Sequence, residues 1–119
     1  MKVAVSSEGK TLDSKMDERF ARAPFFIFAD TKTGEFEVHD NDETMNAAHG
    51  AGVQASRLMA ERGVEVVITG HCGPNAFRAL NAAGIEVVTG ASGTVSEVLA
   101  KFKSGEIKPA SNPDVKGHW

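Results

Sequence analysis

The chain has a single cysteine, and this scarcity excludes several kinds of site. Among 119 residues, Cys72 is the only thiol, so no intramolecular disulfide can form, and a lone thiol is typical of a reducing compartment. A four-cysteine metal site within one chain is excluded for the same reason. Any metal centre must therefore use mixed ligands, a second subunit, or ligands that arrive with the metal.

Long apolar runs and an excess of positive charge are also missing. No segment approaches the roughly 18 apolar residues of a membrane span, and the first residues lead into a short strand-like run that does not resemble a signal peptide. The 13 Lys and Arg against 16 Asp and Glu give a net charge of -3, the wrong sign for neutralising a phosphate backbone. We therefore expect a cytoplasmic protein with neither a membrane nor a nucleic acid among its partners.

Hydrophobic patterning indicates strands and helices that alternate along the chain. Strands are expected at 2–6, 25–29, 35–39, 64–69 and 85–88, and helices from about 52 to 62, at 76–83 and from 95 to 104. The segment 40–50 has no periodicity and is expected to be an exposed, mobile loop. Thr94 and Glu97 form a capping-box pattern at the start of the last helix.

This order, β-β-β-α-β-α-β-α, predicts an α/β fold of the ribonuclease H-like type, with a five-stranded mixed sheet and helices on both faces. Residues 1–105 are expected to form the single domain and 106–119 a C-terminal tail. Strands 25–29 and 35–39 should form a hairpin, with the second strand half-buried. The first and fourth strands should lie side by side, so that the loops after them meet in a crevice at their carboxyl ends.

The loop 70–75 holds the strongest chemical signal. Cys72 comes just before a helix with Pro74 in its first turn, where the helix dipole and a protonated His71 both favour thiolate over thiol. Gly73 lets the backbone approach a bound group closely. Cys72 is therefore a candidate soft ligand or nucleophile, and the alternative is that it is a small buried hydrophobic residue.

Two other segments carry candidate binding groups. His49, held by glycine directly before a helix, is a candidate imidazole ligand or a solvated loop histidine. Arg19 and Arg22 offer two guanidinium groups for an anion, or belong to a salt-bridged loop. Met45 offers a thioether, although a surface methionine commonly has no such role.

The absent motifs argue against an enzyme. The expected first strand has no carboxylate, so the two-magnesium site of a nuclease cannot be assembled there. Walker, Cys-x-x-Cys and nucleophile-elbow motifs are missing. A thiol enzyme based on Cys72 would need a third group to orient a histidine base, and none can be assigned from the sequence.

Several blocks together resemble the dinitrogenase iron-molybdenum cofactor biosynthesis family, in particular its small single-domain members. The resemblance covers nearly the whole chain through the first strand and the blocks 18–26, 49–52, 70–77 and 90–94. Ala21 departs from the glycine that is typical of the family. The resemblance implies a ribonuclease H-like fold that binds, carries or stores a metal-sulfur cluster of iron-sulfur, iron-molybdenum or molybdenum-copper type, without turning over a substrate.

For the site, the expected metal ligands are Cys72, His71 and His49, and the expected cofactor-binding residues are Arg19, Arg22, His49, Gly73 and Asn75. A single thiolate cannot hold a four-iron cluster, so either two chains share one or the guest brings its own sulfide ligands. Expected partners are cluster donor or acceptor proteins, with a homodimer as an open alternative. The competing function is a protein-interaction or regulatory module without a metal.

Overall fold

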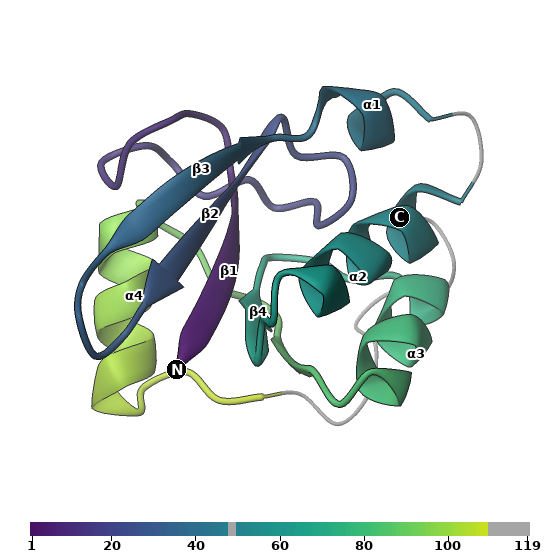
Figure 1. Cartoon of the computed structure of the whole chain (residues 1–119). Coiled ribbons are helices and arrows are strands. Elements are labelled where there is room, and N and C mark those ends of the chain that lie inside the picture. Colours follow the sequence, from purple (N-terminus) through teal and green to yellow (C-terminus); the bar gives the residue numbers. More distant parts are fainter. Residues whose placement is uncertain (48–49, 110–119) are drawn as a thin grey trace.

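The computed structural model describes residues 1–47 and 50–109 (Figure 1). It contains five strands and four helices in the described residues, and all three predicted helices are present. Their bounds are β1 Lys2–Ser7, β2 Phe25–Asp30, β3 Phe36–Asp40, α1 Asp42–Met45, α2 Ala51–Glu61, β4 Val66–Ile68, α3 Pro74–Ala82, β5 Glu86–Val88 and α4 Val95–Ser104. None of the helices in the described part of the chain is long and apolar enough to span a membrane.

The strands form one mixed sheet in the order β3-β2-β1-β4-β5. β2 pairs antiparallel with both β1 and β3, whereas β4 pairs parallel with β1 and β5. The predicted hairpin and the predicted pairing of the first and fourth strands are therefore confirmed. The central strands β1 and β4 are fully buried, or nearly so, after Lys2, as expected for strands covered on both faces.

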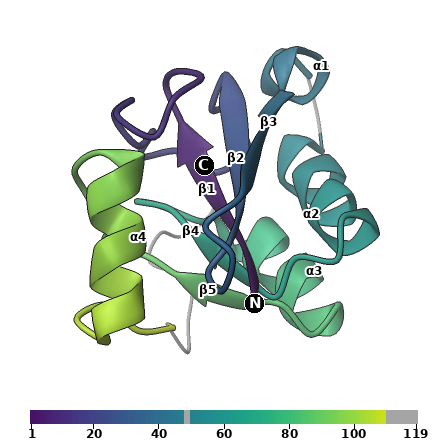
Figure 2. The ribbon, with the colours of Figure 1, turned by 60° about the vertical axis from the view of Figure 1, so that its left-hand side comes forward.

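Helices cover both faces of the sheet, as predicted (Figure 2). On one face, α2 and α3 pack over a core that includes Phe28, Val67 and Leu80. On the other face, α4 packs over Val5 and Ile68. Alternate residues of each strand supply the two cores because successive side chains of a strand point to opposite faces.

The start of α4 has the predicted capping box. The Thr94 side chain accepts a hydrogen bond from the backbone N–H of Glu97 at 3.1 Å, and the Glu97 carboxylate accepts one from the N–H of Thr94 at 3.0 Å. The bond that the carboxylate accepts from the Thr94 backbone holds the pKa of Glu97 below its usual value. Gly105, with φ of 82°, ends the helix in the left-handed conformation that glycine adopts readily.

The prediction that 40–50 is an unstructured loop is wrong for its first half, which contains the one-turn helix α1. The Asp40 carboxylate accepts the backbone N–H of Asp42. The buried Asn41 side chain donates to the carbonyls of Ala21 and Ala23 at 3.1 and 2.8 Å. These side-chain bonds fix the turn without any apolar periodicity, so no helical pattern in the sequence announces it.

The prediction of a half-buried third strand is also wrong. β3 is the edge strand, and Phe36 and Val38 remain 44% and 37% exposed. Both pair with β2 residues on the α4 side of the sheet, since Phe36 lies opposite Ala29 and Val38 opposite Ile27. The alternation in the sequence correctly indicated a strand, but it could not show that the covering helix stops short of the edge.

On the opposite face of β3, His39 lies against Phe28 and Arg62. Its ring lies edge-on to Phe28, with centroids 6.2 Å apart, and its Nδ1 lies 3.4 Å from Nη2 of Arg62. Burial and then the charge of Arg62 lower the pKa of His39, against the opposing effect of Asp40 and Glu37. Below the ordinary value of 6.5, the unfolded state therefore binds more protons than the folded state.

We expect the free energy of unfolding to fall as pH drops through and below 6.5, and the His39→Gln variant to show a shallower slope over the same range. Urea titrations at closely spaced pH values measure both slopes. An unchanged slope in the variant would show that groups other than His39 cause the pH dependence.

Candidate functional site

The segment 15–20 lies across the carboxyl ends of the strands. Its backbone is bonded on both sides: Met16 N–H donates to the Gly93 carbonyl and Asp17 N–H to the Ser6 carbonyl, both at 2.9 Å. Met16, Asp17 and Phe20 are buried. The loops after β1 and β4 therefore meet as predicted. Segment 15–20, however, fills the crevice that we expected between them, so any bound molecule must lie on the outer side of this segment.

Two backbone hydrogen bonds join this segment to the loop after β4. The His71 N–H donates to the Glu18 carbonyl at 2.6 Å, and the Phe20 N–H donates to the His71 carbonyl at 3.2 Å. Gly70 makes this approach possible, because a Cβ there would lie 2.8 Å from Cα of Glu18. The pairing places Arg19 directly beside His71.

Asp17 orients Arg19, a role that the sequence did not indicate. One carboxylate oxygen of Asp17 accepts the Arg19 backbone N–H at 2.9 Å, and its two oxygens lie 3.4 Å from Nε and Nη2 of Arg19. The Asp17 side chain is 8% exposed and that of Arg19 is 49% exposed. The only sequence signal was the Asp-x-Arg spacing, which is too common to identify a positioning carboxylate.

Arg22 has a bracing role that the sequence did not indicate. Its Nη1 donates to the carbonyl of Met45 at 2.9 Å and to that of Ala47 at 2.6 Å. The side chain thus ties the loop before β2 to the end of α1. Arg22 still supplies a positive charge at the site, but one of its nitrogens is committed to the protein itself.

Cys72 is fully buried, with no exposed surface. It belongs to the core under α2 and α3, together with Phe20, Ala21 and Ala76. Its predicted place before the helix is confirmed, since Gly73 is the N-cap of α3 and Pro74 its first residue. A bond from the sulfur to a guest at the surface requires the loop to move, whereas the packed-cysteine alternative requires no movement.

The structure gathers four of the predicted residues around one small hollow. Arg19, Arg22, His71 and Gly73 line it, and no carboxylate does. A broader hollow of about 550 Å³ adjoins it at Arg19 and has a mixed lining of Glu8, Lys15, Asp17, Glu18, Arg19, Pro24 and Met45. Arg19 therefore borders both hollows.

Two predicted residues are not part of this group. Asn75 is exposed, and its side-chain oxygen accepts a bond from Nη2 of Arg78 at 2.7 Å on the surface of α3. His49 lies outside the described residues. Within residues 1–47 and 50–109, no three His, Cys, Asp or Glu side chains are placed to hold a metal ion together.

Comparisons with known proteins agree on one group. Residues 1–105 match the family described as dinitrogenase iron-molybdenum cofactor. The apo form of the orange protein of Desulfovibrio gigas is 39% identical, with 96% of each chain covered and a TM-score of 0.93. A Thermotoga protein described as NifB-like is 41% identical over 91% of each chain, with a TM-score of 0.79. An uncharacterized protein of Methanocaldococcus jannaschii is 25% identical over 91% of this chain and 90% of its own length.

Proposed function

Because the chain belongs to the dinitrogenase iron-molybdenum cofactor family, we propose that it binds and carries a metal-sulfur cluster as cargo, without catalysing a reaction. A donor protein supplies the cluster and an acceptor protein receives it. The cluster is of iron-sulfur, iron-molybdenum or molybdenum-copper type. The runner-up function is an interaction or regulatory module that binds a partner protein and no metal.

The observation that carries the proposal is the small hollow lined by Arg19, Arg22, His71 and Gly73. Its lining holds two guanidinium groups and an imidazole but no carboxylate. It lies at the N-terminus of α3, where the helix dipole favours negative charge. The N–H groups of a half-exposed guanidinium that the protein does not use can donate charge-assisted hydrogen bonds to an anion. These groups together favour an anionic guest that rests over the hollow.

The side chains around the hollow suit a complete cluster better than a bare metal ion. A bare ion needs several protein ligands in one place, and the described residues offer no such group of three. An anion that brings its own sulfide ligands needs only charge and shape. His71 is the accessible direct ligand, since it is partly exposed, whereas Cys72 can bond only after the loop 70–72 shifts.

We expect Arg19→Gln to weaken retention of the cargo about tenfold to a hundredfold, because a hydrogen bond to a charged group contributes about 1.5–3 kcal/mol. The protein is loaded anaerobically with iron and sulfide, or with tetrathiomolybdate and copper, and then desalted. Visible absorbance and bound metal measure retention. Arg57→Gln, which removes an exposed arginine of α2, is the matched control and should retain the cargo like the native chain.

A second variant, Cys72→Ala, decides how the cargo is held. Retention by both Cys72→Ala and the native chain supports a site built from charge and shape, and loss in the variant alone supports a sulfur ligand. If the native chain retains no metal from either mixture, the carrier proposal is wrong and the interaction module takes its place.

A further inference from the structure

The outer edge of β3 is open. Within the described residues, β3 pairs only with β2, and no strand lies on its other side. Open edges usually carry proline, charged side chains, lysine above all, or a bulge that prevents further pairing. The sequence Phe36–Asp40 has no proline, lysine or bulge, and its charged side chains are the acids Glu37 and Asp40. This edge is therefore available to another strand.

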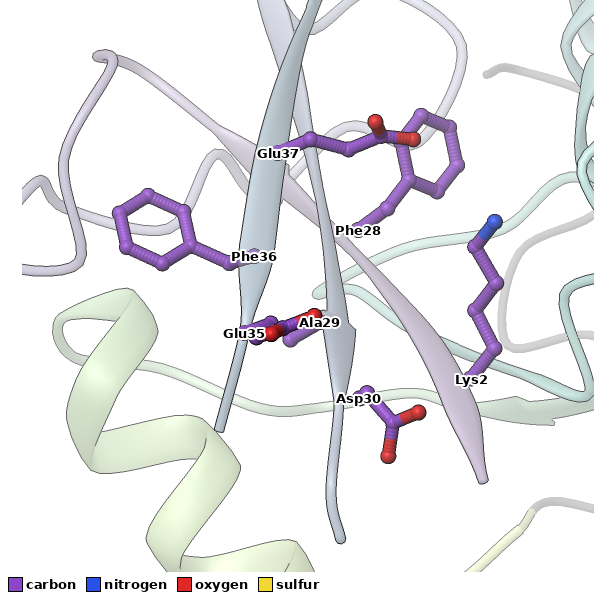
Figure 3. Close-up of a pocket in the computed structure, with 7 residues that line it drawn as sticks. All are labelled: Lys2, Phe28, Ala29, Asp30, Glu35, Phe36 and Glu37. Atoms are coloured by element: carbon purple, nitrogen blue, oxygen red, sulfur yellow. The ribbon is translucent and has the colours of Figure 1, made fainter. Parts of the chain in front are cut away.

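The two faces of β3 differ in chemistry. Figure 3 shows Phe36 on one side of the strand and Glu37 on the other. Phe36 and Val38 are the exposed apolar residues of the α4 face, and Phe36 borders a groove of about 220 Å³ that also contains Leu99 of α4. Glu37 and His39 occupy the α2 face, where Glu37 is paired with Arg62 at 2.9 Å.

The pairing with β2 fixes which backbone groups point outward. The Glu35 carbonyl accepts the N–H of Asp30, and the Asn41 N–H donates to the Pro24 carbonyl, both at 2.9 Å. Odd-numbered residues of the strand therefore direct their backbone groups toward β2. Because these groups alternate along an antiparallel strand, those of Phe36, Val38 and Asp40 point away from the sheet.

We propose that two copies of this chain associate by antiparallel pairing of their β3 strands, with Val38 on the two-fold axis. In this register Phe36 and Asp40 of one copy exchange backbone bonds with Asp40 and Phe36 of the other, and the two Val38 residues bond to each other. On the α2 face, Glu37 lies opposite His39 of the second copy. On the α4 face, the two Val38 side chains lie side by side at the axis, and each Phe36 lies opposite Asp40 and diagonal to Val38 of the second copy.

Side-chain charge selects this register over its neighbours. With the axis at Glu37, two carboxylates would face each other directly, and with the axis at His39, two imidazoles would do so. With the axis at Val38, an acid faces an imidazole on both sides of the axis. The strand is therefore complementary to itself, and this is the reason for proposing a second copy as the occupant.

Sedimentation velocity over a range of protein concentrations tests the association. The native chain should shift toward the mass of a dimer as concentration rises, and Val38→Lys should weaken the association at least tenfold. Val53→Lys is the matched control, because Val53 is 43% exposed on α2 and distant in sequence from β3. A native chain that stays monomeric at every concentration, or a Val38→Lys variant that dimerises normally, would overturn the proposal.

Cysteine cross-linking tests the register independently of stability. Residues in a hydrogen-bonded antiparallel pair have Cα atoms about 5.5 Å apart, within the range of a disulfide. Val38→Cys should therefore form a covalent dimer on mild oxidation, whereas Phe36→Cys, which faces Asp40 of the second copy, should cross-link far more slowly. Equal rates for the two variants would contradict the register. Peptide mapping distinguishes these disulfides from any that involve Cys72.

Discussion

Replacing Gly70 by alanine is expected to lower the free energy of unfolding by about 1–3 kcal/mol, the usual cost of adding a methyl group where there is no space. The new Cβ would lie 2.8 Å from Cα and 2.9 Å from the carbonyl oxygen of Glu18. Both are backbone atoms, so the strain cannot be relieved by turning a side chain. The loop after β4 must separate from segment 15–20.

That separation would also move Arg19 away from His71, so Gly70→Ala should reduce both stability and cargo retention. Urea unfolding measures the first and the loading assay the second. Gly34→Ala is the control: its φ of 76° makes alanine costly by about 1–2 kcal/mol, but no atom lies within 4 Å of the added Cβ. It should lose stability while retaining the cargo. Full retention by Gly70→Ala would show that the two loops need not touch for binding.

Replacing Arg22 by methionine is expected to cost about 1.5–3 kcal/mol of stability, because two carbonyl oxygens lose a charged donor. Methionine keeps much of the apolar stem, so the change removes mainly the bonds to Met45 and Ala47 at 2.9 and 2.6 Å. The end of α1 should loosen from the loop before β2. Hydrogen exchange of the amides around 41–47 and urea unfolding measure the two effects.

Arg57→Met provides the comparison for Arg22→Met, since it removes an exposed arginine of α2 and should change stability by less than about 0.5 kcal/mol. If Arg22→Met is as stable as Arg57→Met, the bonds to the two carbonyls contribute nothing measurable. In that case the charge of Arg22 acts at the candidate site alone.

Much of the fold could be predicted from the sequence because its signals are local. The β-branched run before Gly70 indicated a buried parallel strand, and the Thr94 and Glu97 pair indicated where α4 begins. The capping box, the hairpin and the pairing of β1 with β4 are all present. The ribonuclease H-like assignment remains a prediction, whereas the mixed sheet with helices on both faces is confirmed.

The arrangement of the candidate site depends on contacts between segments that are distant in sequence. No residue pattern in the sequence predicts these contacts. Arg19 and His71 are adjacent because backbone atoms of Glu18 and Phe20 bond to the His71 peptide groups, and backbone bonds do not constrain residue identity. The bracing by Arg22 likewise uses carbonyls, which every residue has. The sequence could therefore identify cationic residues but not their separate roles.

The burial of Cys72 is a second feature of the site that the sequence could not predict. The motif correctly placed the thiol ahead of a helix N-terminus, a position that favours reactivity when solvent can reach it. Accessibility depends on what packs above the loop, and here Phe20, Ala21 and Ala76 belong to the same core. These residues come from separate segments of the chain, and no spacing rule in the sequence predicts that they share a core with Cys72.

The central position of β1 has a consequence for how the chain folds during synthesis. β1 is synthesised before the other four strands described, yet its parallel partner β4 begins only at Val66. The hairpin of β2 and β3 can join β1 early, because those contacts are closer in sequence. The opposite edge of β1 stays unpaired until the chain has passed Ile68, so folding of the first half cannot finish on its own. Val3, Ala4 and Val5 are fully buried in the folded protein. In the nascent chain they therefore pass through a stage in which β4 does not yet pair with them.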